Sequence, residues 1–400
     1  SRDFLDTNGV KQRTPAEIEE NKTHFFAPKA DGDFEKDMLS TLSDLNVCSK
    51  KGLSETFDST IGAKSVYMPF GGKNQLTPVT AMAAKIVGGE TDDCTVSAYG
   101  YNPNLMSSSP FTGAIYSIVT SVAKVVAAGA EMNDIRLTLQ EFFMRLRDDK
   151  KRWGVPLSAL LGALYVQINL GLAAIGGKDS MSGTFEDIDV PPTLISFALA
   201  PAKASRLITN VPEKAGEKMW LLPMRKDENS VPDFGYLKKL YAAVHSGISA
   251  GVIKHATVVE QGGIASAVAK SCFGNGLGFE FALPEGELFT ERYGDIIVCA
   301  DDVSSLGVDS VYIGETKQGD FVCGGKTVSY SKVLRAYTSK LDGVFPATAA
   351  AEGDVPDCDY KGDGKYSSIA IKTAKPRVFI PAFPGTNCEL DTERKFRLAG

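Results

Sequence analysis

Two long apolar segments with helical spacing constrain the fold of this chain more than any other feature of its sequence. The first begins at Ser109-Pro110, an N-cap followed by a proline at the first helical position, and continues to Ala128. The second, Leu157–Ala174, leads into the Gly-rich stretch Ile175–Gly183. Because strand-like runs such as Asp93–Tyr99 surround both helices, the pattern predicts an α+β layer.

The same kind of pattern restarts after Pro201. A strand at Met219–Leu222 and a helix at Tyr236–Ser249 are followed by Glu260-Gln261-Gly262-Gly263, which opens a helix at Ile264–Ser271. Further strands are expected at Ala256–Val259, Gly278–Phe281, Ile296–Ala300 and Val311–Gly314, with a hairpin in Asp320–Val328. This predicts a second α+β domain.

The composition limits the classes of protein to which this chain can belong. The 400 residues suffice for two cores, and the net charge of −6 supplies no basic field for nucleic acid. The seven cysteines are scattered without a C-x-x-C pair, which is typical of a reduced cytosolic protein and indicates no zinc site. We expect no membrane partner, because no signal peptide or apolar run of membrane-spanning length is evident. The missing initiator Met and the end at Gly400 suggest a piece of a longer chain.

The Gly-rich stretch carries the chemistry. Glycines let a backbone approach a ligand, and a lysine ammonium and hydroxyls are groups that bind a phosphate ester. We therefore expect a ligand-binding loop at Gly176-Gly177-Lys178-Asp179-Ser180-Met181-Ser182. It lacks the G-x-x-x-x-G-K-[ST] spacing of a Walker loop, and an ordinary polar loop is the alternative.

The full string is more specific. GGKDSMSG followed by a PP-x-L-x-S-F-A strand resembles the second half of the large single-chain phosphoribosylformylglycinamidine synthases. Segments in the same order agree, namely Ser109–Ala114, Glu260–Gly263 and Phe383–Glu389, the last of which resembles the start of the family's glutaminase domain. The resemblance implies an α+β half of the aminoimidazole ribonucleotide synthase type, followed by the first strand of an α/β glutaminase domain.

The resemblance also implies a division of the chain. The expected parts are a polar N-terminal segment or end of a preceding domain (1–45), an A-type domain (46–202), a B-type domain (203–335), a helix and linker (336–375) and the glutaminase start (376–400). The last part would contain a buried strand at Val378–Pro381.

The family reaction is an ATP- and Mg²⁺-dependent amidation of formylglycinamide ribonucleotide with ammonia from glutamine, in purine biosynthesis. The resemblance implies that Gly176, Gly177 and Lys178 contact the nucleotide, and that Ser180 and Ser182 contact the substrate phosphate. It implies no catalytic residue and no metal ligand in this chain. The partners would be the first synthetase half and the glutaminase domain of the same cytoplasmic protein, so the piece would be inactive alone.

Large members of the family also hold an auxiliary ADP with Mg²⁺. The positions that match its metal ligands are here Ala81, Thr120, Lys124 and Val258, which supply no carboxylate. We expect this auxiliary site to be empty or filled without metal, with Lys124 occupying the place of a metal ion.

Two other interpretations stay open. This half could be mainly a scaffold with a vestigial nucleotide site, or the chain could be a self-sufficient homodimer like aminoimidazole ribonucleotide synthase. A piece that exposes an apolar face could also form a homodimer. Weaker candidates are more simply explained as turns, caps, or surface or core groups; they are Asp58–Ile61, Tyr99, Tyr101, Asn102, Ser107–Ser109, His24, His245, His255 and Cys388.

Overall fold

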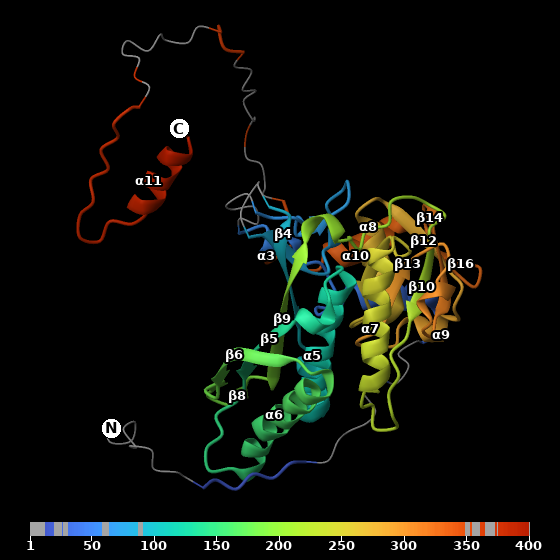
Figure 1. Cartoon of the computed structure of the whole chain (residues 1–400). Coiled ribbons are helices and arrows are strands. Elements are labelled where there is room, and N and C mark those ends of the chain that lie inside the picture. Colours follow the sequence, from blue (N-terminus) through green and yellow to red (C-terminus); the bar gives the residue numbers. More distant parts are fainter. Residues whose placement is uncertain are drawn as a thin grey trace. The chain divides into compact units, whose positions relative to one another are not determined.

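The computed structural model describes residues 13–19, 26, 31–57, 64–86, 91–348, 353, 361–364, 373 and 375–399. The chain divides into two units, Ser1–Ala349 and Ala350–Gly400, and each is considered by itself (Figure 1). The predicted Pro346–Ser368 linker lies largely outside the described residues, and so do Asp58–Ile61 and His24.

A five-stranded sheet forms one part of the first unit. Its order is β3-β4-β9-β5-β6, and only β5 and β6 run parallel. The strands are β3 (Met82–Lys85), β4 (Asp93–Gly100), β5 (Arg136–Phe142), β6 (Ala173–Ser180) and β9 (Thr193–Lys203). On β9, residues such as Leu194, Ala198 and Ala200 are buried, whereas Phe197 and Leu199 between them are exposed, as expected for a sheet covered on one face.

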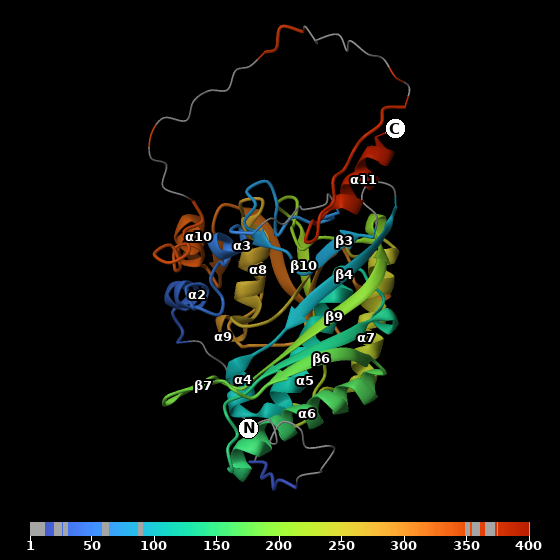
Figure 2. The same ribbon diagram turned by 90° about the vertical axis from the view of Figure 1, so that its left-hand side faces the viewer.

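Helix α5 (Pro110–Ala127) packs against β4 and β9 on the buried face of this sheet, and α6 (Lys150–Leu170) packs alongside α5. The Ser109 side chain accepts a hydrogen bond from Thr112 N and caps α5, as predicted. Asp149 caps α6, and Gly171 ends it in the left-handed conformation. Figure 2 looks onto the opposite face of the sheet, with α5 behind the strands and α6 along the lower edge below β6.

A seven-stranded sheet forms the other part of the first unit, in the order β11-β13-β10-β14-β12-β15-β16. Its strands are β10 (Lys218–Leu222), β11 (His255–Val258), β12 (Leu277–Phe281), β13 (Ile296–Cys299), β14 (Val311–Gln318), β15 (Phe321–Cys323) and β16 (Lys326–Val328). Its main helices are α7 (Phe234–Ser249), α8 (Gly263–Phe273), α10 (Tyr330–Thr338) and α2 (Phe34–Leu42). The predicted second α+β pattern is therefore present.

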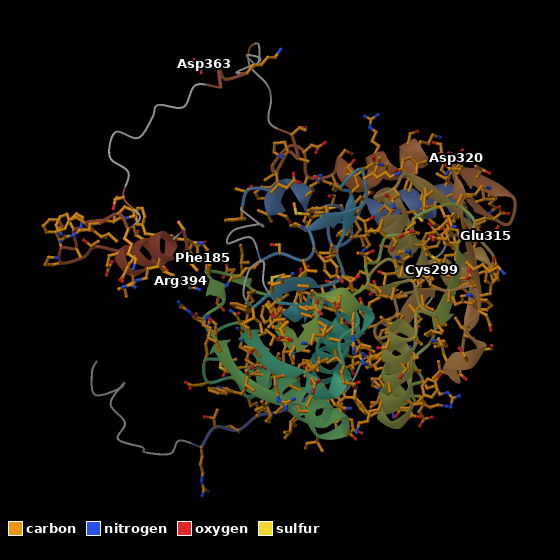
Figure 3. All side chains as sticks on the ribbon, turned by 45° about the horizontal axis from the view of Figure 1, so that its top comes forward. Phe185, Cys299, Glu315, Asp320, Asp363 and Arg394 are labelled. Carbon is orange, nitrogen blue, oxygen red and sulfur yellow. The ribbon has the colours of Figure 1, made fainter. Side chains whose placement is uncertain are left out.

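The remaining elements are short. They are α3 (Lys51–Ser54), α4 (Pro103–Ser108), α9 (Glu285–Leu288), β1 (Phe70–Gly71), β2 (Thr77–Pro78), β7 (Thr184–Phe185), β8 (Ile188–Asp189) and the 3-10 helices η3 (Met132–Asp134), η4 (Ala204–Arg206) and η5 (Ser304–Leu306). The hairpin of β7 and β8 exposes Phe185 (Figure 3).

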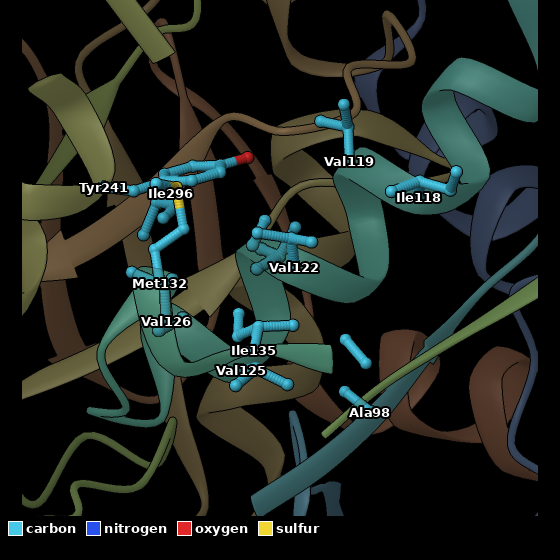
Figure 4. Packing of buried hydrophobic residues seen from close by; sticks show 14 of the residues in the cluster. Ala98, Ile118, Val119, Val122, Val125, Val126, Met132, Ile135, Tyr241 and Ile296 are labelled. Carbon is cyan, nitrogen blue, oxygen red and sulfur yellow. The ribbon is translucent and has the colours of Figure 1, made fainter. Parts of the chain in front are cut away.

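Two hydrophobic clusters hold the first unit together. The larger joins α5 to residues of both sheets, and Figure 4 shows Val119, Val122 and Val126 of α5 near Tyr241 of α7 and Ile296 of β13. The smaller lies on the other face of the seven-stranded sheet, among α2, α8 and α10. Because the apolar side chains of α5 pack with residues of both sheets, the two sheets share one apolar core.

One expectation about long apolar segments is wrong. Helices α5 and α6 are each long and apolar enough to cross a membrane by length and composition, so the expectation that no run reaches that length is wrong. Of the most apolar window, 89% is buried inside the fold in α5 and 44% in α6. The apolar length of α5 is thus used in the core, whereas α6 keeps an exposed apolar side.

The expected loop at Gly176–Ser182 is mostly a strand. Helix α6 ends at Leu170, and β6 then pairs with β5 from Ala173 to Ser180. A pair of glycines is locally typical of a loop, and the sequence therefore favoured one. The prediction failed because pairing with the distant strand β5 determines the structure of this segment.

The second unit contains α11 (Glu389–Leu398). The predicted buried strand at Val378–Pro381 is wrong, because these residues have no regular structure, and Val378 and Phe379 are exposed. In the described part of this unit no other strand offers hydrogen bonds to it, and a single strand is not stable alone. Cys388, the residue before α11, is exposed.

Candidate nucleotide and phosphate sites

Strand β6 carries the residues predicted to bind nucleotide and substrate phosphate. Along β5 and β6 the register pairs Leu139 with Gly177, Gln140 with Lys178 and Phe142 with Ser180. A register shift precedes these pairs, between Leu137 and Thr138 of β5. Strand β6 is therefore an edge strand of the sheet. Among the described residues, no other strand pairs with the backbone of Gly176–Ser180 on the side away from β5.

The two glycines of this strand have different reasons to be glycine. A Cβ on Gly176 would meet nothing within 4 Å, so its open side is available for a ligand. A Cβ on Gly177 would lie 2.4 Å from the carbonyl oxygen of Leu139, which is closer than any real contact. The neighbouring strand, rather than a ligand, requires glycine at position 177.

Lys178, Ser180 and Ser182 supply the polar groups. The Lys178 ammonium lies 5.4 Å from the centre of the Phe142 ring, and Lys178 itself is exposed. The Ser180 and Ser182 hydroxyls lie 3.4 Å apart. An ammonium and two hydroxyls within one short segment are suited to a phosphate group.

A carboxyl pair on the opposite face of the same two strands was not predicted. Glu141 of β5 is paired in register with Asp179 of β6, and Glu141 is 7% exposed. Burial, together with hydrogen bonding and repulsion from Asp179, raises the pKa of Glu141 to about 7. The sequence signal was an acidic residue in line with Leu137 and Leu139 in the alternating pattern of this strand, but its neighbour depends on strand pairing.

A cavity of about 300 Å³ lies elsewhere, where the two sheets meet. Its wall combines residues from β4, α5, the end of β11 and α8 with residues near Cys48. The polar groups that we use below are Lys50, Thr80, Lys124, Asn210, Glu260 and Lys270. We call this space the lysine cavity.

Lys124 and Glu260 form an ion pair in the lysine cavity. The Lys124 ammonium lies 2.8 Å from Glu260 Oε1 and donates a hydrogen bond of 3.1 Å to the carbonyl oxygen of Tyr99. It also lies 4.6 Å from the centre of the Tyr99 ring. Burial works to lower the pKa of Lys124, but the Glu260 carboxylate and Tyr99 outweigh it, so the pKa is raised.

The expected auxiliary positions cluster at this cavity only in part. Lys124 and Val258 line it, whereas Ala81 and Thr120 are buried nearby in the core. Magnesium prefers carboxylate and carbonyl oxygens, and Glu260, the carboxylate among the described lining residues, is already paired with Lys124. The residues present do not fit an ADP–Mg²⁺ group.

The weaker candidates have structural roles in the described residues. Asn102 caps α4 and Ser109 caps α5. His245 Nδ1 lies 3.0 Å from the carbonyl oxygen of Gly129, and burial lowers the pKa of His255. None of these observations indicates a catalytic triad.

Comparison with known proteins gives a consistent relationship at low identity. No protein-family model matches the chain. The PurL subunit of phosphoribosylformylglycinamidine synthase from Methanocaldococcus jannaschii is 23% identical over 326 residues, which are 72% of this chain and 42% of that protein. The subunit from Methanococcus aeolicus is 24% identical over 330 residues, covering 74% of this chain and 42% of that protein. The chain is thus similar to PurL over most of its length and spans less than half of these relatives.

Solved structures show the fold. Phosphoribosylformylglycinamidine synthase II from Thermotoga maritima matches 81% of this chain and 54% of its own, with 15% identity and a TM-score of 0.56. The T. maritima PurL structure complexed with FGAR gives the same TM-score at 13% identity, covering 81% of this chain and 56% of its own. The chain therefore has the α+β fold of PurL, as predicted.

Proposed function

We propose that this chain is one half of the synthetase core of a carbon–nitrogen ligase. The complete enzyme would convert formylglycinamide ribonucleotide, glutamine and ATP to formylglycinamidine ribonucleotide, glutamate, ADP and phosphate in purine biosynthesis. The observation that carries the proposal is the similarity to PurL subunits over about three quarters of the chain, together with the PurL fold. A related T. maritima structure is complexed with FGAR and another with ATP.

Within that enzyme, β6 would act as a phosphate-binding edge. Gly176 leaves open space for the approach of a nucleotide, and Lys178 offers an unshielded ammonium to its phosphates. The Ser180 and Ser182 hydroxyls would donate to the substrate phosphate. Lys178 would stabilise charge on the transferring phosphoryl group, since a fixed cation favours the transition state over the bound substrate.

The polar groups of β6 suit the phosphates of a nucleotide better than they suit a metal ion. The ammonium and hydroxyls suit ATP phosphates, whereas the carboxyl pair Glu141–Asp179 is the local source of oxygen ligands among the described residues of β5 and β6. Mg²⁺, when bound with ATP, would neutralise phosphoryl oxygens. We assign no Mg²⁺ ligand to this chain, because Glu141 is buried and the Glu141–Asp179 pair points to the face of the sheet opposite Lys178.

The other half of the core and the glutaminase domain would be the partners. The sheet face that carries Lys178 also exposes Met82, Phe197 and Leu199. A mixed apolar and cationic face is suited to burial against a second synthetase half with the ribonucleotide between them. We place the complete enzyme in the cytoplasm, where its soluble substrates would be.

The scaffold interpretation is favoured by one specific observation. Lys124 is paired with Glu260 where large family members would hold metal, so this part of the half has a structural ion pair instead of metal ligands. The two interpretations are compatible, because the lysine cavity and β6 are separate parts of the fold. The homodimer interpretation has the same exposed sheet face in its favour.

Activity assays distinguish these interpretations. ADP release is measured with formylglycinamide ribonucleotide, ATP, Mg²⁺ and either glutamine or ammonium, for this chain alone and for the natural full-length protein. The proposal expects substrate-dependent ADP release from the full-length protein and none from the chain alone. Activity of the chain alone with ammonium would favour the homodimer, and an inactive full-length protein would contradict the proposed reaction.

A further inference from the structure

The lysine cavity contains more positive than negative charge. Its described wall includes three lysines, Lys50, Lys124 and Lys270, and one carboxylate, Glu260, so three positive charges minus one negative charge leave +2. The Lys124–Glu260 pair is neutral as a unit. The excess therefore belongs to Lys50 and Lys270, and an uncompensated charge away from water is unfavourable.

Lys50 is stabilised by dipoles rather than by a counter-ion. Its ammonium donates to the carbonyl oxygens of Leu45 and Cys48, at 2.6 and 2.7 Å, and contacts Cys48 Sγ at 3.2 Å. Lys50 is therefore held in place beside the cavity with its charge still available.

Lys270 has no such partners. Within the described residues its ammonium makes no hydrogen bond and no ion pair. Burial lowers its pKa, while Glu260 works to raise it and Lys124 and Lys50 add to the lowering. Glu260 is the one carboxylate among the described lining residues and is already paired with Lys124, so a bound anion would stabilise the charged form of Lys270 further.

Two more buried polar atoms lack partners. Asn210 is 6% exposed; its Nδ2 donates to the carbonyl oxygen of Pro78 at 2.9 Å, but its Oδ1 has no hydrogen-bond partner. The buried Thr80 Oγ1 also has none. Both residues line the cavity. Because buried polar groups are nearly always satisfied, these atoms indicate a ligand that donates to Asn210 and bonds with Thr80.

We propose that the lysine cavity binds the phosphate group of a small phosphorylated molecule without a divalent cation, through Lys270 and Lys50. A phosphate monoester carries close to two negative charges near neutral pH, which matches the excess charge. The cavity volume of about 300 Å³ is at the lower end for small-molecule sites and admits a phosphorylated sugar or a compact nucleotide. The site is independent of β6 and of the proposed reaction.

The metal-free character follows from the same residues. A divalent cation in this cavity would face three ammonium groups, and Glu260 would have to leave Lys124 to ligate it. The lysines already supply the charge that a metal ion would bring to a phosphate. The cavity thus differs in kind from an ADP–Mg²⁺ site.

Calorimetric titration in EDTA tests the proposal. The probes are inorganic phosphate, ribose 5-phosphate, AMP and adenosine, which lacks phosphate. We expect the phosphorylated probes to bind and adenosine not to bind, with no gain in affinity when Mg²⁺ replaces EDTA. Equal affinity for inorganic phosphate and the two esters would identify free phosphate as the ligand. Tighter binding of the esters would identify a phosphate ester whose sugar or base contacts Asn210.

Variants locate the site. Lys270→Met should weaken binding of the phosphorylated probes by about 10- to 100-fold, the worth of one charge-assisted hydrogen bond. The control is Lys239→Met, an exposed lysine of α7, which should leave binding unchanged. Because Lys270→Met removes an uncompensated charge, it should unfold at the same temperature as the parent or higher in phosphate-free buffer. The proposal is wrong if no phosphorylated probe binds, if binding requires Mg²⁺, or if Lys270→Met binds like the parent chain.

Discussion

The Lys124 ammonium of α5 lies 2.8 Å from the Glu260 carboxylate, so an ion pair links α5 to the short connection between β11 and α8. The side chain of Lys124 is 9% exposed and that of Glu260 is 32% exposed. The pair occupies the place where the family resemblance implied metal ligands, and it gives that region a cation that is part of the chain.

Loss of one partner of this pair should destabilise the fold. We expect Glu260→Gln to lower the free energy of unfolding by about 1 kcal/mol, the low end for an unsatisfied charged group, because Glu260 is partly solvated. The double variant Lys124→Met/Glu260→Gln should lose less than the sum of the two single variants. Urea unfolding measures all three, and additive losses would show that the two side chains do not interact.

The two glycines of β6 should respond differently to alanine. Gly177→Ala places a Cβ against the Leu139 carbonyl oxygen and should cost about 1–3 kcal/mol of stability, the usual cost of overpacking. The matched control Gly176→Ala meets nothing within 4 Å and should change stability by less than about 0.5 kcal/mol. Thermal or urea unfolding compares them, and equal effects would mean that β6 does not lie against β5 as described.

Glu141 should make stability depend on pH. Its pKa is raised to about 7 in the folded chain from the ordinary value of 4.5, so the folded state binds this proton more tightly than the unfolded state does. The resulting stabilisation is fully present below about pH 4.5 and is lost as the pH rises through about 7, a change of about 3 kcal/mol.

Glu141→Gln removes this titration. We expect the variant to gain stability relative to the parent as the pH rises from about 5 to about 8.5, because glutamine stays neutral. Glu228→Gln, at an exposed position, is the control and should show no such trend. If parent and Glu141→Gln keep a constant difference across this range, Glu141 does not titrate near neutral pH.

The exposed side of α6 should drive self-association of the chain by itself. Its exposed apolar residues are Leu157, Leu160, Leu161, Leu164, Tyr165 and Ile168. We expect concentration-dependent dimers in sedimentation velocity, reduced by Leu164→Lys with Ile168→Lys but not by Asn169→Lys. Dimers that persist in the double variant would place the contact elsewhere, for example on the open sheet face.

Local signals predicted α5 well, whereas the helix expected at Leu157–Ala174 begins earlier and ends earlier, as α6 at Lys150–Leu170. Ser109 and Pro110 mark the start of α5, and apolar spacing gave its length, because capping and periodicity act within one or two turns. The strand at β6 was missed because its partner β5 is decided by tertiary pairing. The same non-local pairing places Glu141 beside Asp179, so no local pattern could have assigned that carboxyl pair.

The candidate sites show the same limit. Lys178, Ser180 and Ser182 were identifiable because they are neighbours in sequence. Lys50, Asn210 and Lys270 come together only through the packing of distant segments, and each is an ordinary polar residue in its own context. For Lys124, the resemblance suggested that its charge replaces a metal ion, and the structure supplied the partner, Glu260.

The most direct test of the proposed function is the turnover of the natural full-length protein with Lys178→Ala. Substrate-dependent ADP release should fall by about 10²- to 10³-fold, the usual cost of removing one fixed charge or donor that stabilises a transition state. Lys203→Ala, an exposed lysine on β9 of the same sheet, should retain near-parent turnover. A Lys178→Ala enzyme as fast as its parent would contradict a role for β6 in phosphoryl transfer.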